Sequence, residues 1–272
     1  MLAEEANKQD MQTMREQRDL PVGVFDSGVG GISVLREMVR LLPQEDFLFF
    51  GDSANAPYGT RSQEEIRELT MRHVLHLREE GIKAVVIACN TATSAAIAAL
   101  RETFTDMPVI GIEPALKPAA EMKEDPAVLV MATPGTVGGE KFHMLSHRYE
   151  DSARIYPVAC PGLVEFVEAG LLEGPEVESA LHALLDPCLE KGPDAIVLGC
   201  THYPFLRRAI RAVAGDGPVI LDGSEGTARQ LRRELTKKDL LTKRSRPGIV
   251  QFEMSLPGKE ALCRRLLTQE HI

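Results

Sequence analysis

The chain has 272 residues, of which 44% are hydrophobic and 26% charged, a composition that is typical of a folded globular protein and excludes wholesale disorder or a fibrous repeat. By length alone we expect two domains of middling size or one large one. The 31 basic and 40 acidic residues give a net charge of −9, which argues against a nucleic-acid partner or an anionic membrane surface.

The chain begins with a polar segment, residues 1–20, that mixes acids, bases and glutamines without an apolar stretch. It therefore lacks the hydrophobic middle of a secretion signal, and we expect a flexible amino-terminal arm on a cytoplasmic protein. Later apolar runs, such as Ala84 to Cys89, have the length of a strand and fall far short of the roughly 18 residues that a membrane span needs. No membrane partner is expected.

From Leu20 onward, short apolar runs alternate with longer segments of helical periodicity, which indicates an α/β protein with mostly parallel sheets. The predicted strands are Pro21–Phe25, Phe47–Phe50, Ala84–Ala88, Ala127–Met131, Ile155–Val158, Ala195–Leu198 and Pro218–Leu221. The predicted helices are Ile32–Leu42, Glu64–Glu80, Ser94–Phe104, Val177–Lys191 and Phe205–Val213. A locally basic segment, Arg229 to Arg246, is interpreted as a solvated connection. An edge strand, Gly248–Met254, and a closing helix, Lys259–Leu267, follow it.

A weak internal repeat relates two segments, Ala84–Thr91 and Ala195–His202, which share an apolar strand followed by Cys and two polar residues. We therefore predict two similar α/β domains, the first formed by 21–112 plus 224–267 and the second by 113–223. In parallel sheets ligands bind beyond the carboxyl ends of the strands. The active site should accordingly lie in the cleft between the domains.

The chain has five cysteines, an odd number, and none forms a CxxC pair with zinc-like spacing. Neither a disulfide framework nor a metal site is predicted. Cys89 and Cys200 each follow a strand and precede a helix, where unpaired N–H groups and the helix dipole stabilise a thiolate. A single buried cysteine is usually core filling, but two in equivalent positions favour acid–base chemistry. We assign Cys160, Cys188 and Cys263 to structure.

Other polar residues lie close to these thiols in the sequence. His202 follows Cys200 by two residues and is either a helix cap or a partner of the sulfur. Asp26 and Ser27 open a glycine-rich turn, Gly28–Gly31, which does not match the GxGxxG nucleotide fingerprint. They are either a tight turn with a cap or a carboxylate and hydroxyl for an ammonium group.

The order of these motifs resembles glutamate racemase, a family of the aspartate/glutamate racemase superfamily. The resemblance covers about Val22 to Ala228. The blocks that carry it are Val24–Gly31, Gly51–Ser53 with Pro57–Gly59, Ala88–Ala92, Ala132–Thr136 and Leu198–Pro204. It implies a racemase without a cofactor that interconverts L- and D-glutamate and supplies D-glutamate for peptidoglycan. It also implies a homodimer, since homodimers are common in the family.

In such a racemase one cysteine removes the α-proton as a thiolate and the other delivers a proton to the opposite face. By position these are Cys89 and Cys200, with Asp26 and His202 assisting. Glu168 resembles the family's carboxylate on the His202 side, although Glu165 is an equally good candidate by spacing alone. The resemblance further implies a set of substrate-binding residues: Asp26, Ser27, Pro57, Tyr58, Gly59, Asn90, Thr91, Thr133, Thr136, Thr201 and His202.

Three alternatives remain open. The same fold could act on a related amino acid such as aspartate. It could also bind an amino acid without turnover, which deuterium uptake at the α-carbon would distinguish. A dinucleotide-dependent oxidoreductase is disfavoured by the broken glycine motif.

Overall fold

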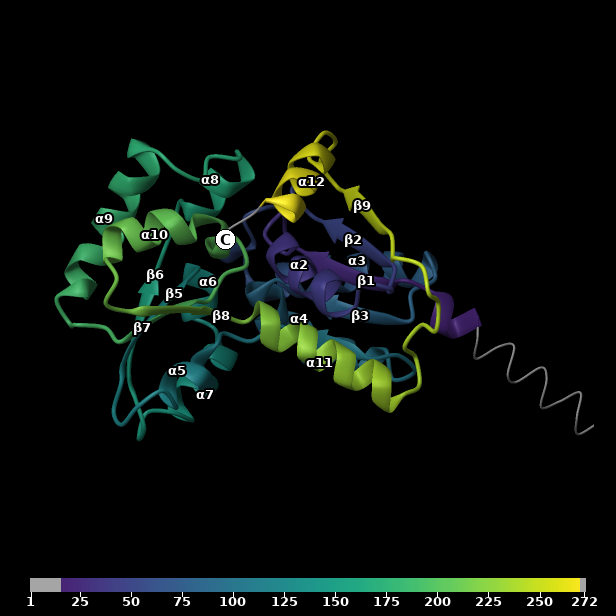
Figure 1. Cartoon of the computed structure of the whole chain (residues 1–272), viewed down its shortest axis with the longest axis horizontal. Helices are drawn as coiled ribbons and strands as arrows, with labels where there is room; N and C mark the ends of the chain where they lie inside the picture. The colour runs from purple at the N-terminus through teal and green to yellow at the C-terminus, as the bar shows by residue number, and fades with distance from the viewer. Residues whose placement is uncertain (1–15, 270–272) are drawn as a thin grey trace, which may run out of the picture.

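The computed structural model describes residues 16–269 and contains two sheets, which lie on the two sides of the molecule in Figure 1. The first, sheet A, has the strand order β4-β3-β1-β2-β9, and the second, sheet B, has the order β6-β5-β7-β8. The strands of sheet A are β1 (Val22–Asp26), β2 (Phe47–Gly51), β3 (Ala84–Ile87), β4 (Val109–Gly111) and β9 (Val250–Met254). Those of sheet B are β5 (Ala127–Ala132), β6 (Arg154–Ala159), β7 (Ala195–Leu198) and β8 (Val219–Asp222). All the paired strands are parallel, so the predicted α/β class is confirmed.

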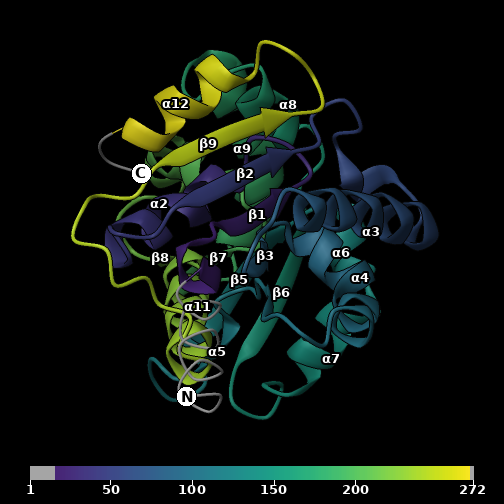
Figure 2. The ribbon, with the colours of Figure 1, turned by 90° about the vertical axis from the view of Figure 1, so that its right-hand side faces the viewer.

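Helices cover both faces of each sheet, as parallel sheets require. In sheet A, α2 (Ile32–Leu41), α11 (Ser224–Lys237) and α12 (Glu260–Thr268) lie opposite α3 (Gln63–Glu79) and α4 (Asn90–Thr103) (Figure 2). In sheet B, α9 (Pro175–Leu189) and α10 (Arg207–Ala214) lie opposite α5 (Leu116–Ala120) and α7 (Glu140–His147). Four short elements follow strand ends: η1 (Tyr58–Thr60), α6 (Pro134–Val137), α8 (Leu163–Glu168) and η2 (Tyr203–Leu206).

Alternate strand residues enter different hydrophobic cores because successive side chains point to opposite faces. On β1, Val24 packs in the core that includes α2, whereas Phe25 packs in the core beneath α3 and α4. The first of these cores continues into sheet B, where Leu129 and Ile196 belong to it. The two sheets are thus joined by shared apolar packing behind the site.

The two sheets share a topology that explains where the thiols lie. In each sheet the first strand, β1 or β5, sits between the second and the third, so the chain changes direction at that strand. Cys89 and Cys200 follow the third strands, β3 and β7. Ligands of such sheets bind at this switch point. We propose the domain division 21–112 plus 224–267 and 113–223, which agrees with the strands that each sheet contains.

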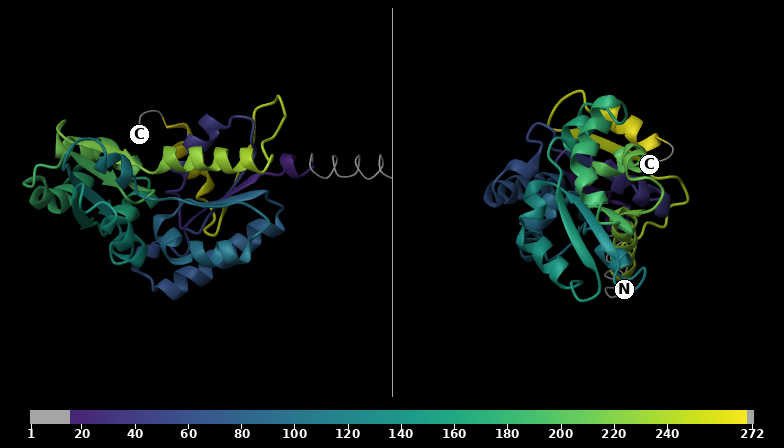
Figure 3. Two further views of the ribbon diagram at one scale, coloured as in Figure 1. Left: turned by 90° about the horizontal axis from the view of Figure 1, so that it is seen from below. Right: turned by 90° about the vertical axis from the view of Figure 1, so that its left-hand side faces the viewer.

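The interpretation of Arg229 onward as a solvated connection is wrong for its first part. Residues 224–237 form α11, which runs along the face of sheet A opposite α3 and α4 (Figure 3). The local excess of basic residues obscured an apolar stripe, Ala228, Leu231 and Leu235, which is buried against α2. The short strand β4 and the helices α5 to α8 were also not predicted, because three to eight residues carry too little periodicity.

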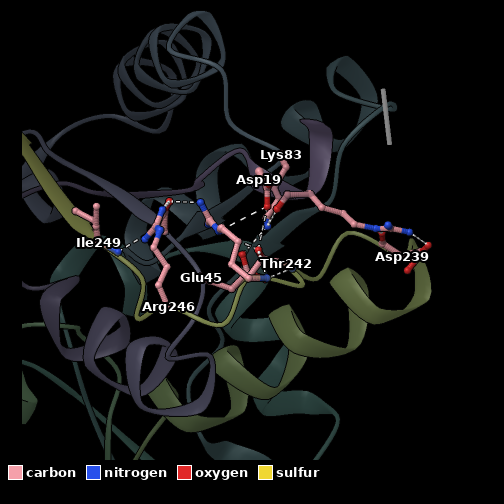
Figure 4. A network of polar contacts seen from close by, with 10 residues as sticks. Asp19, Glu45, Lys83, Asp239, Thr242, Arg246 and Ile249 are labelled. Carbon is pink, nitrogen blue, oxygen red and sulfur yellow. Dashed lines mark hydrogen bonds and ion pairs between the residues drawn. The ribbon is translucent and has the colours of Figure 1, made fainter. Parts of the chain in front are cut away.

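At the end of sheet A away from the thiols, a polar network joins distant segments (Figure 4). Lys83 and Glu45 form a fully buried ion pair with an N–O distance of 2.5 Å, and Glu45 also accepts from the Thr242 backbone N–H. Lys83 donates to the Arg18 carbonyl oxygen, so residues 16–20 are attached here. The rest of the predicted arm, 1–15, lies outside the described residues. Within 16–269, no helix is long and apolar enough to cross a membrane.

Candidate active site

The glycine-rich turn after β1 brings the two halves into close approach. A Cβ on Gly28 would lie 1.9 Å from Glu168 Oε1, and one on Gly30 would lie 2.3 Å from His202 Nδ1. Glycine is therefore needed here because side chains from the sheet B half occupy the space. The turn belongs to a contact between the halves rather than to a phosphate loop.

Cys89 caps α4, as its place after β3 predicts. Its sulfur accepts from the Ala92 N–H at 3.4 Å and lies 3.3 Å from Ser27 Oγ. Burial, together with the nearby charge of Asp26, raises the pKa of the Cys89 thiol to about 12. The hydrogen bonds lower this pKa but do not outweigh burial, so the expectation of a thiolate stabilised by the helix start is not met in this closed form.

Asp26 connects the surroundings of the two thiols. It accepts from the Gly28 N–H and from Thr201 Oγ1, both at 2.9 Å. Burial raises its pKa to about 6, although the charge of His202 acts in the opposite direction. A carboxyl group with this pKa is suited to accepting and releasing protons near neutral pH.

Cys200 lies before a 3-10 turn, η2, and not at the first turn of an α-helix, because α10 begins only at Arg207. Its sulfur lies 3.8 Å from His202 Nδ1, and His202 Nε2 lies 2.9 Å from Glu168 Oε1. Burial lowers the pKa of His202, but its contacts with Cys200 and Glu168 outweigh this and raise it well above the usual value. A protonated imidazole is therefore held against the Cys200 sulfur.

Glu168, not Glu165, is the carboxylate that contacts His202. Burial alone would raise its pKa, but hydrogen bonds from His202, the Val29 N–H and Ser53 Oγ hold the pKa at about 2. Glu165 lies outside, in the wall of a neighbouring cavity. Spacing along the chain could not decide between them because both belong to α8.

A further set of hydroxyl and amide groups lies at the start of α4 and around α6. The Oγ1 atoms of Thr91, Thr133 and Thr136 are 3.0 Å from one another. Asn90 Oδ1 is buried and has no hydrogen-bond partner within the described residues. A buried oxygen without a hydrogen-bond partner destabilises the folded state unless a ligand donates a hydrogen bond to it.

One cavity brings these groups together. Its lining residues are Ser27, Pro57, Tyr58, Gly59, Cys89, Asn90, Thr91, Thr133, Val164, Cys200, Thr201 and His202. Asp26, Glu168 and Thr136 do not line it but contact residues that do. The volume of this cavity is only about 10 Å³, because groups from both halves close around it.

Several neighbours of the site were missed. Val164 lines the cavity, and Asp52 accepts from Tyr58 Oη at 2.7 Å and from His73 Nε2 at 3.0 Å. These contacts hold Tyr58 at the cavity wall. The polar residues that end β2, Gly51–Ser53, indicate a site in the sequence, but the sequence does not show that Asp52 contacts Tyr58 and His73, which lie 6 and 21 residues further along.

The family model of the Asp/Glu/Hydantoin racemases matches residues 22–231. The chain belongs to this racemase family. The glutamate racemase of Clostridium novyi is 47% identical over 245 residues, which cover 90% of this chain and 95% of that protein. The glutamate racemase of Clostridium acetobutylicum is 49% identical over 242 residues, which cover 89% and 94%.

Solved structures agree with this assignment to the racemase family. Glutamate racemase from Francisella tularensis, solved in complex with D-glutamate, has a TM-score of 0.81 at 28% identity and covers 93% of this chain and 96% of that one. The Escherichia coli enzyme, solved with L-glutamate and the activator UDP-MurNAc-ala, has a TM-score of 0.80 at 34% identity and covers 91% and 95%. The racemase described here is thus an isomerase with the fold of these relatives.

Proposed function

We propose that the enzyme is a glutamate racemase in which Cys89 and Cys200 exchange protons with opposite faces of the α-carbon. The observation that carries this proposal is that both sulfur atoms line one cavity, one from each sheet. Inversion at a carbon requires an acid and a base on opposite sides of it. Relatives at 47% and 49% identity that are named glutamate racemase support the choice of substrate.

The two thiols have different helpers. On one side, His202 can donate a hydrogen bond to a Cys200 thiolate, and Glu168 keeps the imidazole protonated. On the other side, Cys89 is held as a neutral thiol beside Asp26. The two thiols therefore have unlike surroundings, and the acid and base roles exchange between them when the reaction runs in reverse.

The substrate-binding groups would stabilise the carbanion that forms after proton loss. Asn90, Thr91 and Thr201 line the cavity, and their polar groups would bind the α-carboxylate, where negative charge develops. The remaining predicted contacts, Ser27, Pro57, Tyr58, Gly59, Thr133 and Thr136, would complete the wall. Because the cavity is nearly sealed, water is excluded, and the substrate enters only after the halves separate.

The same proposal covers the biological role. D-glutamate from this reaction would supply peptidoglycan synthesis, which fits a cytoplasmic enzyme whose partner is a small molecule. We further propose a homodimer that needs no organic cofactor for the proton transfer.

The test is exchange of the α-proton in heavy water. Incubation with either enantiomer of glutamate, without pyridoxal phosphate, should give deuterium at the α-carbon together with racemisation. A parallel incubation with L-aspartate measures the preference between substrates. Binding of glutamate without deuterium uptake, or faster turnover of aspartate, would overturn the proposal.

A further inference from the structure

A lysine directly before the last helix contacts Glu168, the carboxylate that supports the Cys200 side. Lys259 directly precedes α12, which packs beside α8 at the top of the molecule (Figure 1, Figure 2). Its Nζ atom donates to the backbone oxygen of Glu168 at 2.5 Å and lies 3.5 Å from Glu168 Oε2. One ammonium group therefore fixes both the backbone and the side chain of Glu168.

This contact joins the two halves of the enzyme. In the chain, Lys259 follows β9 of sheet A. Glu168 ends α8, which comes after β6 and before β7 of sheet B. Glu168 is the last residue of α8, where the negative end of the helix dipole also favours a cation. Both side chains are mostly buried, with 22% and 13% exposed for Lys259 and Glu168, so solvent screens the contact only in part.

The effect of Lys259 should reach the sulfur through two hydrogen bonds. Glu168 Oε1 lies 2.9 Å from His202 Nε2, and His202 Nδ1 lies 3.8 Å from Cys200 Sγ. A carboxylate that can rotate away from His202 would leave the imidazole without its orienting partner. Small displacements of this kind slow proton transfer strongly, because the transfer requires well-aligned heavy atoms.

Lys259 also lines a second cavity, of about 250 Å³, outside the site. This vestibule shares Pro57 and Val164 with the thiol cavity and includes Glu165 and Glu168 in its wall. Among its lining residues in the described part of the chain, Lys259 carries the positive charge. A role limited to attracting the anionic substrate would therefore change KM rather than kcat.

We propose that Lys259 is a positioning residue that fixes Glu168 against His202 when the two halves close, and so sets the rate of proton transfer at Cys200. This inference rests on the proposed racemase function. If the inference is correct, removing the Lys259 ammonium group slows proton transfer at Cys200 and leaves the rate of proton transfer at Cys89 unchanged.

The experiment compares Lys259→Met with Lys259→Arg and with Arg265→Met. Arg265 lies on the same helix and donates to the Gly170 oxygen at 3.4 Å, so its variant controls for weaker docking of α12. We expect kcat to fall about tenfold in Lys259→Met with less than about a threefold change in KM, to recover largely in Lys259→Arg, and to stay within about twofold in Arg265→Met.

Isotope effects with α-deuterated glutamate provide the second measurement. In Lys259→Met the primary effect should increase in the direction in which Cys200 takes the deuteron and decrease in the direction in which Cys200 returns a solvent proton. A change in KM alone, an equal loss in Arg265→Met, or isotope effects that stay equal to those of the wild type would overturn the inference. A wild-type enzyme that does not racemise glutamate would instead overturn the proposed function, and the inference with it.

Discussion

Thr201 Oγ1 donates a hydrogen bond of 2.9 Å to Asp26 Oδ2, and this bond links the loop beside Cys200 to the loop beside Cys89. The two residues are 175 positions apart: Asp26 ends β1 of sheet A, and Thr201 follows β7 of sheet B. Opening the cleft must break this bond together with the contacts of Glu168. The closed form therefore depends on the same polar groups that surround the thiols.

The first prediction concerns the two thiols. Replacing Cys89 or Cys200 by Ala should lower kcat for racemisation by about 10³-fold or more, because each variant lacks the acid or the base. Polarimetry with each enantiomer measures this loss, and circular dichroism checks the fold. Cys188→Ala, on α9 and outside the cavity, is the control and should keep wild-type turnover. Appreciable racemisation by either site variant would refute the assignment.

The second prediction uses the opposite pKa shifts of two carboxyl groups. The Glu168 pKa is lowered from 4.5 to about 2, so its contribution to the free energy of unfolding is present above pH 4.5 and is lost as the pH falls toward 2. The Asp26 pKa is raised from 3.8 to about 6, so its ionisation destabilises the fold above pH 6 and not below 3.8. Each shift corresponds to about 3 kcal/mol.

Urea titrations from pH 2 to 8 provide the measurement. The free energy of unfolding of Glu168→Gln should fall furthest below that of the wild type above pH 4.5. For Asp26→Asn, the difference from the wild type should be more favourable at pH 7 than at pH 4. Glu165→Gln controls for a change on the same helix. Parallel pH curves for the wild type and both site variants would contradict the shifts.

The sequence predicted most of the strands, and the positions of the two cysteines after them, because these signals are local. Apolar runs followed by polar residues mark β1, β3 and β7, and each cysteine comes directly after its strand. The supports of Glu168 could not be predicted in this way, since Val29, Ser53 and Lys259 are 139, 115 and 91 residues away from it. Those contacts depend on how the two halves pack, which periodicity does not report.

The expected chemistry of Cys89 shows the same limit. The sequence predicts its position at a helix start, but not that burial would outweigh the helix N–H groups and raise its pKa. Burial is a property of the closed cleft, to which both halves contribute. For Cys200, the sequence did not indicate the 3-10 turn η2, which contains Tyr203 and Pro204 and separates the thiol from α10.

The third prediction concerns the glycine turn. Gly28→Ala places a methyl group where Glu168 Oε1 lies, and the carboxylate must move away from His202. We expect kcat to fall at least tenfold, by the same loss of alignment as in Lys259→Met. Gly226→Ala is the control, because a Cβ there meets nothing within 4 Å and the residue lies in α11. That variant should keep its activity and gain up to about 1 kcal/mol of stability.

The fourth prediction concerns the buried ion pair at the far end of sheet A. Lys83→Met leaves the Glu45 charge buried without its partner and should lower the free energy of unfolding by about 3–5 kcal/mol. The exposed pair of Arg78 and Asp106 is the matched control, and Arg78→Met should cost less than about 1 kcal/mol. Because Lys83 contacts none of the residues that line the thiol cavity, kcat at 25 °C should remain near wild type in both variants. Equal losses of stability in the two variants would mean that Glu45 is neutral or solvated in the folded chain. The network in Figure 4 would then contribute little to holding residues 16–20 and the Thr242 segment against the sheet.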